Sequence, residues 1–547
     1  MRHIIVIGNG MVGYKFCEKL RKLASPEQLA VTVFGEEPRP AYDRVHLSEY
    51  FSDQNADKLC LAPLDWYAQQ QIDLHTGELV AWIDRRNKII ETHRGKTLTY
   101  DQLVIATGSS AFVPPVPGTD KRGVFVYRTI EDLEATIAYG KKVKSVAVMG
   151  GGLLGLEAAK AMVDMELETH VVEFASRLMP RQLDEAGART LQTRIEELGI
   201  QVHLNKNTQS ISGNGKLDGL HFADGSVLSV DMLVVSAGIR PRDELARSSG
   251  LEVGARGGIV VNDFMQTSDP NIYAIGEVAL HQEMIYGLVA PGYDMANVAA
   301  HHLLGETEKC FAGNDMSTKL KLMGVDVASF GDVFGAKSEH RAIVFEDKVK
   351  SIYKRINVTP DGKQLLGGML VGDAEAYNML QQTMQNGVAL PPNPEGLILG
   401  SRGGESAGVG LDSLPDDAQV CSCEGVTKGM IYEVVLSGEA QSVKEIKACT
   451  KAGTGCGGCM PMVSDLFDLA QAKMGKRVRK VICEHFDYTR QELLDIIQVK
   501  EIRSYDELLN KCGTGDGCEV CKPAVASILA SLWNDLVTKQ DTIQDIN

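Results

Sequence analysis

Residues 4–13 read IIVIGNGMVG, an apolar strand that runs into three glycines spaced as G-x-G-x-x-G and then into a predicted helix through Leu20. In this pattern Gly8 makes a tight turn, Gly10 lets the backbone approach a pyrophosphate, and Gly13 allows close packing of the helix on the strand. The pyrophosphate would lie at the N-terminus of the helix, where backbone N–H groups have no partner within the helix. The stretch predicts a parallel βαβ unit that binds a dinucleotide.

The strand that follows, VTVFGEE at residues 31–37, ends in two carboxylates. Glu36 stands where an acidic side chain accepts hydrogen bonds from ribose hydroxyls, and Glu37 is a near-equal candidate. Glycine turns of this kind also occur for packing reasons alone. Because the strand, the helix and the acid all occur in order here, we favour a nucleotide site over a packing motif.

The pattern returns at residues 145–159, SVAVMGGGLLGLEAA, and the strand THVVEF follows at residues 169–174. Two such units predict two dinucleotide sites in one protein. The second unit supplies Gly150, Gly152 and Gly155, with Glu173 at the acidic position.

Glu173 also bears on the choice of nicotinamide cofactor. A carboxylate pairs with a free 2′-hydroxyl and repels a 2′-phosphate, which calls for an arginine instead. The residues just after Glu173 contain a single arginine, Arg177, three positions past the expected place. The sequence therefore favours NADH over NADPH.

Composition bounds the class of protein. The chain has 547 residues, 44% of them hydrophobic and 23% charged, which allows three or four soluble domains. A net charge of −16 argues against binding to a nucleic-acid backbone. No apolar run reaches the length of a membrane span, and the first strand begins at once, without room for a secretory signal. Twelve cysteines in such a chain indicate metal or redox chemistry, and we expect a cytoplasmic enzyme or electron carrier.

Two cysteine motifs near the C-terminus repeat each other. The first reads C-x-C-x32-C-x2-C and the second, 62 residues later, reads C-x-H-x32-C-x2-C. Soft ligands in two tight pairs within Gly-rich loops suit either an iron–sulfur cluster or zinc. In the second set a histidine could ligate an iron, as in Rieske centres, or the repeat could pack and bind nothing. The two sets are Cys421, Cys423, Cys456 and Cys459, and Cys483, His485, Cys518 and Cys521.

The order of the two nucleotide units resembles the flavoprotein pyridine-nucleotide reductases, in which the N-terminal site holds FAD and the inserted site holds NAD(P)H. The segments ATGS (106–109), SAGIRP (236–241) and YAIGE (273–277) match motifs of that superfamily. The family has Asp where this chain has Glu277, and no pair of neighbouring cysteines takes the place of its redox-active disulfide. The resemblance implies an FAD site of Gly8, Gly10, Gly13, Glu36, Arg44, Thr107, Gly108 and Glu277, and an NAD site of Gly150, Gly152, Gly155, Glu173 and Gly238. It assigns no catalytic residue.

A closer resemblance covers essentially the whole chain. The segments AYDRVHLS (41–48), VYRTIEDL (126–133) and CSCEGVTKG (421–429) resemble the flavin-containing half of cytoplasmic NAD(P)H-dependent nitrite reductase large subunits. Related flavoproteins carry a lysine where this chain has Glu49. The first cysteine repeat resembles the ferredoxin associated with bacterioferritin, which implies that its four cysteines hold a [2Fe–2S] cluster. Without the redox-active disulfide, a flavin reductase of this kind needs another group to accept electrons from the flavin. This need also favours the cluster over a zinc site.

The catalytic half of that family requires a C-x5-C…C-x3-C set beside sirohaem. This chain contains no C-x3-C pair. We therefore expect either a truncated protein or a stand-alone electron-input subunit, and an acceptor that supplies the sirohaem.

These inferences combine into an α/β fold with two Rossmann-like dinucleotide-binding domains, an α+β module and two small, mainly helical cysteine-rich domains. The predicted divisions are an FAD-binding domain at 1–115 and 241–310, an NAD(H)-binding domain at 116–240, the module at 311–390, a linker at 391–418, a [2Fe–2S] domain at 419–475, a second repeat at 476–534 and a polar tail at 535–547.

The predicted function is an oxidoreductase in which NADH reduces FAD by hydride transfer and the flavin passes electrons to the cluster, and on to a sirohaem nitrite reductase module. The runner-up is the electron-input subunit of an assimilatory nitrate reductase. A reading from a different class is a flavin-bearing scaffold whose cysteine domains hold zinc and dock a partner without turnover.

Overall fold

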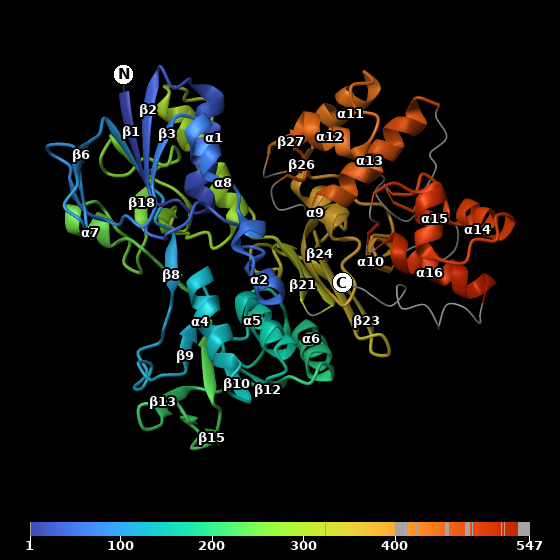
Figure 1. The fold of residues 1–547 in the computed structure, drawn as a ribbon, viewed down its shortest axis with the longest axis horizontal. Helices are drawn as coiled ribbons and strands as arrows, with labels where there is room; N and C mark the ends of the chain where they lie inside the picture. Colours follow the sequence, from blue (N-terminus) through green and yellow to red (C-terminus); the bar gives the residue numbers. More distant parts are fainter. Residues whose placement is uncertain are drawn as a thin grey trace. The chain divides into compact units, whose positions relative to one another are not determined.

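The computed structural model describes residues 2–322, 324–399, 411, 414–421, 424–454, 459–475, 482–483, 485–515, 517–518 and 520–533 (Figure 1). By its internal contacts the chain divides into two compact units. The first is Met1–Met430 with Thr450–Val463, and the second is Ile431–Cys449 with Ser464–Asn547. The predicted polar tail and most of the Gly- and Ser-rich part of the predicted linker lie outside the described residues.

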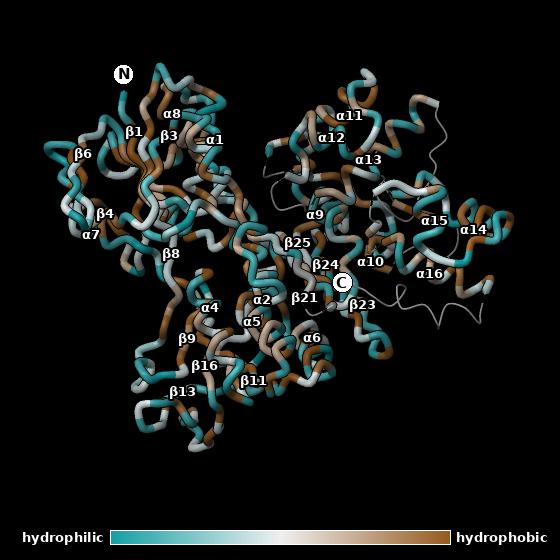
Figure 2. The backbone as a smooth tube through the Cα atoms, viewed as in Figure 1, coloured by the Kyte–Doolittle hydropathy of each residue, from teal (hydrophilic) through white to brown (hydrophobic). Residues whose placement is uncertain are grey.

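The first parallel sheet of the larger unit has the order β19-β7-β1-β2-β3. Ile4, Ile5 and Val6 at its centre are fully buried, and β1 turns from hydrophilic at its start to hydrophobic along the rest of the strand (Figure 2). The helices α1 (Met11–Leu23) and α8 (Val289–Leu303) lie side by side (Figure 1). The strands are β1 (Arg2–Ile7), β2 (Leu29–Phe34), β3 (Ile72–His75), β7 (Gln102–Ile105) and β19 (Ile272–Ala274), so a segment from beyond residue 270 completes the sheet.

The second parallel sheet has the order β12-β11-β10-β16-β9 and repeats the same logic. Val146 and Val148 are fully buried in its core. Its strands are β9 (Val124–Val126), β10 (Ser145–Met149), β11 (Glu168–Val172), β12 (Gln201–His203) and β16 (Met232–Val235), and its helices are α4 (Ile130–Gly140), α5 (Leu153–Asp164) and α6 (Glu185–Glu197).

Two antiparallel strands, β8 (Ser109–Ala111) and β17 (Ile239–Pro241), pair where the chain passes between the two sheets. The larger unit contains further short elements. They are α2 (Tyr50–Asp53), α3 (Leu64–Gln69), β4 (Val80–Asp84), β5 (Ile89–Thr92), β6 (Thr97–Thr99), β13 (Thr208–Ser212), β14 (Gly219–Phe222), β15 (Val227–Leu228), α7 (Glu244–Ser249), β18 (Ile259–Val261) and β20 (Ala279–His281), with short 3₁₀ turns at Leu47–Glu49, Ala56–Leu59 and Gly276–Val278.

The α+β module is a five-stranded antiparallel sheet of order β21-β22-β25-β24-β23. It packs against the start of α6, because Tyr353 donates a hydrogen bond to Asp184, the N-cap residue of α6, at 2.7 Å and Arg355 pairs with the same carboxylate at 3.0 Å. The elements are β21 (Thr318–Leu322), β22 (Val325–Gly331), β23 (Arg341–Asp347), β24 (Ile352–Val358), β25 (Leu365–Val371), α9 (Tyr377–Gln385) and α10 (Gly396–Leu399).

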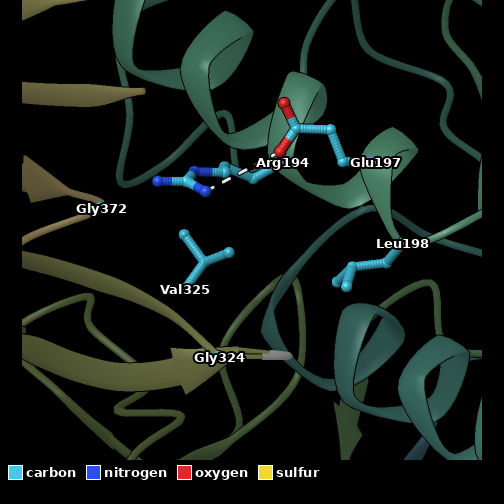
Figure 3. A pocket seen from close by; sticks show the side chains of 6 residues that line it. All are labelled: Arg194, Glu197, Leu198, Gly324, Val325 and Gly372. Carbon is cyan, nitrogen blue, oxygen red and sulfur yellow. Dashed lines mark ion pairs between the residues drawn. The ribbon is translucent and has the colours of Figure 1, made fainter. Parts of the chain in front are cut away.

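A small cavity of about 140 Å³ marks the seam between α6 and this sheet (Figure 3). It is lined by Arg194, Glu197, Leu198, Gly324, Val325 and Gly372, and Arg194 pairs with Glu197 at 3.8 Å. The cavity is too small for a dinucleotide and lies apart from the glycine motifs, so we assign it to domain packing.

The cysteine-rich region is mainly helical, as predicted. Its two repeats correspond in secondary structure as well as in sequence, because α11 and α12 begin 62 residues before α14 and α15. The elements are β26 (Gln419–Cys421), β27 (Val426–Thr427), α11 (Lys428–Leu436), α12 (Val443–Thr450), α13 (Met460–Lys473), α14 (Arg490–Val499), α15 (Tyr505–Cys512) and α16 (Cys521–Leu532).

Candidate functional site: a dinucleotide cavity and two cysteine centres

A cavity of about 1200 Å³ opens beyond the carboxyl ends of the first sheet. This is larger than most small-molecule pockets, at about 300–1000 Å³, and suits a dinucleotide. The cavity also reaches α5 of the second domain and β21 of the module. All the residues predicted for FAD except Gly13 line it, namely Gly8, Gly10, Glu36, Arg44, Thr107, Gly108 and Glu277.

The three glycines of the first motif are required for different reasons. Gly8 has a φ of +111°, and a Cβ there would collide with the carbonyl oxygen of Ala106. A Cβ at Gly13 would collide with the carbonyl oxygen of Gly8. At Gly10, by contrast, a Cβ would meet no protein atom within 4 Å. The open space at Gly10, at the start of α1, is therefore space that a bound pyrophosphate would need.

The two acidic candidates beyond β2 lie at the cavity but have different partners. Glu37 forms an ion pair with Arg44 and accepts a hydrogen bond from the Tyr42 hydroxyl at 2.7 Å. Glu36 forms an ion pair with Arg242, and its side chain is about half exposed. Glu36 is thus the freer of the two to reach a ribose.

Glu277 is held by two neighbours inside the cavity. The Ser109 hydroxyl donates to its carboxylate at 2.7 Å, and Arg128 forms an ion pair with it. Arg128 and Arg242 were not singled out from the sequence. Both arginines lie in or next to segments that match family motifs, since Arg128 is within VYRTIEDL and Arg242 directly follows SAGIRP.

The second glycine motif repeats the geometry of the first. Gly150 has a φ of +120°, and a Cβ on Gly155 would collide with its carbonyl oxygen. A Cβ on Gly152 would again meet no atom within 4 Å. Gly238, with a φ of +120°, also opens on free space. In both motifs, therefore, the first and third glycines have no space for a Cβ, and the middle glycine faces open space.

Glu173 and Arg177 lie close to this second motif. The Glu173 carboxylate accepts hydrogen bonds from the backbone N–H groups of Gly151 at 2.6 Å and Ala175 at 2.7 Å. Arg177 donates to the carbonyl oxygens of Leu183 at 3.0 Å and Pro180 at 3.3 Å. Because backbone carbonyls engage the guanidinium, it is not arranged to receive a 2′-phosphate.

Glu157, on α5, is a further carboxylate at the cavity wall that the sequence analysis did not single out. Burial raises its pKa to about 7, against a smaller lowering effect of His46. The sequence feature that could have pointed to Glu157 is its position two residues after Gly155, in the helix predicted to follow the second glycine motif. Its side chain is poised to change charge near neutral pH at a nucleotide-sized cavity.

The first cysteine set is only partly described. Cys421 is buried in β26 and Cys459 directly precedes α13, whereas Cys423 and Cys456 lie outside the described residues. The same loop carries Glu424, which forms an ion pair with Lys15 and another with Lys19 at 3.4 Å. Both lysines belong to α1, the helix that begins directly after Gly10. Glu424, three residues after Cys421, thus contacts the helix whose first residues line the dinucleotide cavity.

The second cysteine set lies entirely within the smaller unit, and all four of its predicted members come together. Cys483 Sγ lies 3.6 Å from His485 Nδ1, and Cys518 Sγ lies 3.7 Å from Cys521 Sγ. The four ligand atoms all lie within 4.8 Å of one another. Burial raises the pKa of the Cys483 thiol to about 11. The pKa of Cys518 falls to about 7, because backbone N–H donors outweigh the raising effect of burial.

Comparison with known families decides the class. Residues 2–302, more than half of the chain, match the model of the pyridine nucleotide-disulphide oxidoreductases. The chain belongs to this family. Residues 317–388 match the rubredoxin NAD⁺ reductase C-terminal domain, and residues 419–468 and 481–531 each match the BFD-like [2Fe–2S] binding domain. These matches confirm the predicted fold class and the cofactor classes, namely FAD, NAD(P)H and a [2Fe–2S] cluster.

Individual relatives narrow the comparison. The chain is 49% identical over 549 residues to the nitrite reductase (NADH) large subunit of Escherichia coli K12, covering 100% of this chain and 65% of the relative. It is 36% identical over 551 residues to the assimilatory nitrate reductase electron transfer subunit of Bacillus subtilis 168, covering 100% of this chain and 70% of that one. The predicted likeness to nitrite reductase large subunits is thus confirmed, although the chain spans slightly less than two thirds of the first relative.

Among solved structures, a ferredoxin reductase from Rhodopseudomonas palustris matches with a TM-score of 0.63 and 25% identity. The match covers 70% of this chain and 97% of the other. Among the described residues, no helix is both long and apolar enough to cross a membrane.

Proposed function

We propose that this chain is a cytoplasmic NADH-dependent reductase that passes electrons through FAD to the [2Fe–2S] cluster of the first cysteine repeat, and from there to a sirohaem nitrite reductase module. The observation that carries the proposal is the contact of the cysteine-bearing loop, through Glu424, with Lys15 on the helix that faces the dinucleotide cavity. FAD, when bound, supplies the conversion between a two-electron hydride donor and one-electron acceptors.

The residues of the cavity have separate tasks in this proposal. Gly10 and the N-terminus of α1 bind the FAD pyrophosphate, and Glu36 binds its ribose. Glu277 orients the flavin end, since Ser109 and Arg128 hold its carboxylate in place. The second motif binds NADH, with the backbone at Gly152 facing its pyrophosphate and Glu173 facing its ribose.

The Glu424 contact supports the route by which electrons leave. The Lys15 and Glu424 side chains are 7% and 5% exposed, and Lys19 adds a second cation to the same carboxylate. A shielded pair of this kind is screened less by salt than a surface pair. It would hold the cysteine loop in one position on the flavin-binding domain.

The acceptor is a proposal based on the relatives. The E. coli relative is a nitrite reductase (NADH) large subunit, which favours a nitrite reductase module as the acceptor. The second candidate, the electron-input subunit of an assimilatory nitrate reductase, is favoured by the B. subtilis relative, of which the chain covers a larger share. A scaffold without turnover is the remaining alternative.

A coupled assay distinguishes these functions. The chain, loaded with FAD and iron–sulfur, is mixed with NADH and nitrite, with and without a separately purified sirohaem nitrite reductase module. We expect ammonium only when the module is present, because this chain has no C-x3-C pair for a sirohaem-linked cluster. Electron delivery to a nitrate reductase catalytic subunit, but not to the sirohaem module, would favour the second candidate. Ammonium formed by this chain alone would contradict the proposal.

NADH is expected to reduce the bound flavin at least tenfold faster than NADPH, a difference of about 1.4 kcal/mol. The reason is that a 2′-phosphate would meet the Glu173 carboxylate, while Arg177 is held by backbone carbonyls. Stopped-flow measurement of flavin bleaching with each nucleotide tests this expectation. The double variant Glu173→Ala with Ala175→Arg should narrow the difference, and equal rates in the parent protein would refute the assignment.

A further inference from the structure

The four side chains of the second cysteine set come from two separate segments of one small helical domain, one before α14 and one at and just before the first residue of α16. Cys483 and His485 lie in the turn before α14, where Cys483 forms an isolated bridge with Phe486. Cys521 is the first residue of α16, and Cys518 lies three residues before it. Phe486 and Cys521 are fully buried, so the set is anchored in the domain core.

The spacing of these atoms fits a single tetrahedral ion. With Zn–S bonds of about 2.3 Å and Zn–N bonds of about 2.0–2.1 Å, tetrahedral geometry places the ligand atoms roughly 3.5–3.8 Å apart. The Cys483–His485 and Cys518–Cys521 pairs lie at 3.6 Å and 3.7 Å. The largest separation within the whole set is 4.8 Å, so a modest contraction brings all four atoms around one centre.

The same spacing does not fit a [2Fe–2S] cluster, which the family match of residues 481–531 implies. In such a cluster each pair of ligands belongs to its own iron. The two pairs are then separated by the length of the Fe₂S₂ unit in addition to the ligand bonds. Atoms that all lie within 4.8 Å of one another leave no room for two irons and two bridging sulfides between the pairs.

Cys521 is the buried member of the set and has two polar contacts, whereas the other three side chains are half-buried. Cys521 Sγ accepts a hydrogen bond from the backbone N–H of Cys518 at 3.1 Å and lies 3.1 Å from the Tyr505 hydroxyl. Gly517 packs tightly against Tyr505, since a Cβ on Gly517 would collide with the Tyr505 hydroxyl. Hydrogen bonds to ligand sulfurs fix their positions around a metal.

We propose that the second repeat binds one zinc ion through Cys483, His485, Cys518 and Cys521, as a structural site that takes no part in electron transfer. Three thiolates and one imidazole are an established ligand set for structural zinc, and they leave no open coordination position. The two repeats then share a fold but hold different metals. The cluster of the first repeat stays the single iron–sulfur centre of the chain.

Metal analysis of the untagged 547-residue chain tests the proposal. After exposure to EDTA and gel filtration, elemental analysis should give one zinc and two iron atoms per chain, as one zinc site and one [2Fe–2S] cluster require. Cys518→Ser should remove the zinc and keep the iron and the visible absorption of the cluster. Cys421→Ser, the matched variant in the first repeat, should do the reverse.

A measurement on the unmodified protein tests the proposal even if a variant fails to fold. X-ray absorption at the zinc edge should show three sulfur ligands and one nitrogen ligand, and His485→Cys should change this to four sulfurs. Four irons per chain, halved in Cys518→Ser, would overturn the proposal, as would two irons without zinc. Zinc that is lost in Cys421→Ser and kept in Cys518→Ser would overturn it as well.

Discussion

Gly10→Val is expected to yield folded protein that lacks FAD, with an affinity for FAD lowered on the order of a hundredfold, or about 2.8 kcal/mol. Gly10 has a φ of −82°, which valine adopts readily, and a Cβ there would meet no protein atom within 4 Å. The added methyl groups would instead occupy the space at the start of α1 where the pyrophosphate approaches the backbone. Flavin absorbance of the purified variant, together with titration by added FAD, measures the effect.

Gly152→Val is the matched control, because Gly152 has the same backbone conformation, with a φ of −86°, and the same open surroundings. This variant should retain FAD and be reduced by NADH on the order of a hundredfold more slowly at subsaturating nucleotide. Circular dichroism should show both variants folded. Retention of FAD and of normal reduction rates in both variants would refute the assignment of two separate dinucleotide sites.

Cys421→Ser is expected to abolish the signal of the [2Fe–2S] cluster while leaving reduction of the flavin by NADH nearly intact. A hydroxyl replaces a soft thiolate ligand that iron in a cluster prefers. Reduction of one-electron acceptors that draw on the cluster should fall by at least tenfold. Dyes that take electrons directly from the flavin should be reduced at the parent rate. Electron paramagnetic resonance of the reduced protein and stopped-flow kinetics provide the two measurements.

Cys449→Ser is the control for this experiment, because Cys449 is exposed and belongs to neither ligand set. It should keep the cluster and all rates. The prediction is refuted if Cys421→Ser retains the cluster signal, or if flavin reduction by NADH falls as far as electron transfer to the cluster-dependent acceptors.

Much of the fold followed from local spacing. A G-x-G-x-x-G loop between a buried strand and a helix places its glycines by chain geometry alone, and both motifs take the form that the sequence predicted. The correspondence of the cysteine repeats was also readable, since α14 and α15 begin 62 residues after α11 and α12. These features depend on residues that are neighbours along the chain.

The partners inside the cavity could not be predicted in this way. Glu277 is held by Arg128, which lies 149 residues away in the sequence. Arg242 pairs with Glu36, although the whole second sheet lies between them in the sequence. The pKa of Glu157 is raised only because packing buries its side chain. Pairings over such separations depend on how the two sheets and the module are packed, which no local pattern records.

The second cysteine set shows the same division most clearly. The sequence by itself determined the two ligand pairs, because C-x-H and C-x2-C bring their members together within a turn of chain. Only the tertiary structure decided how far apart the two pairs lie, because that distance is set by the packing of α14, α15 and α16 around a shared core. One ion and a two-iron cluster would use the same four residues and differ in this distance, so our proposal of zinc rests on the fold and not on the motif.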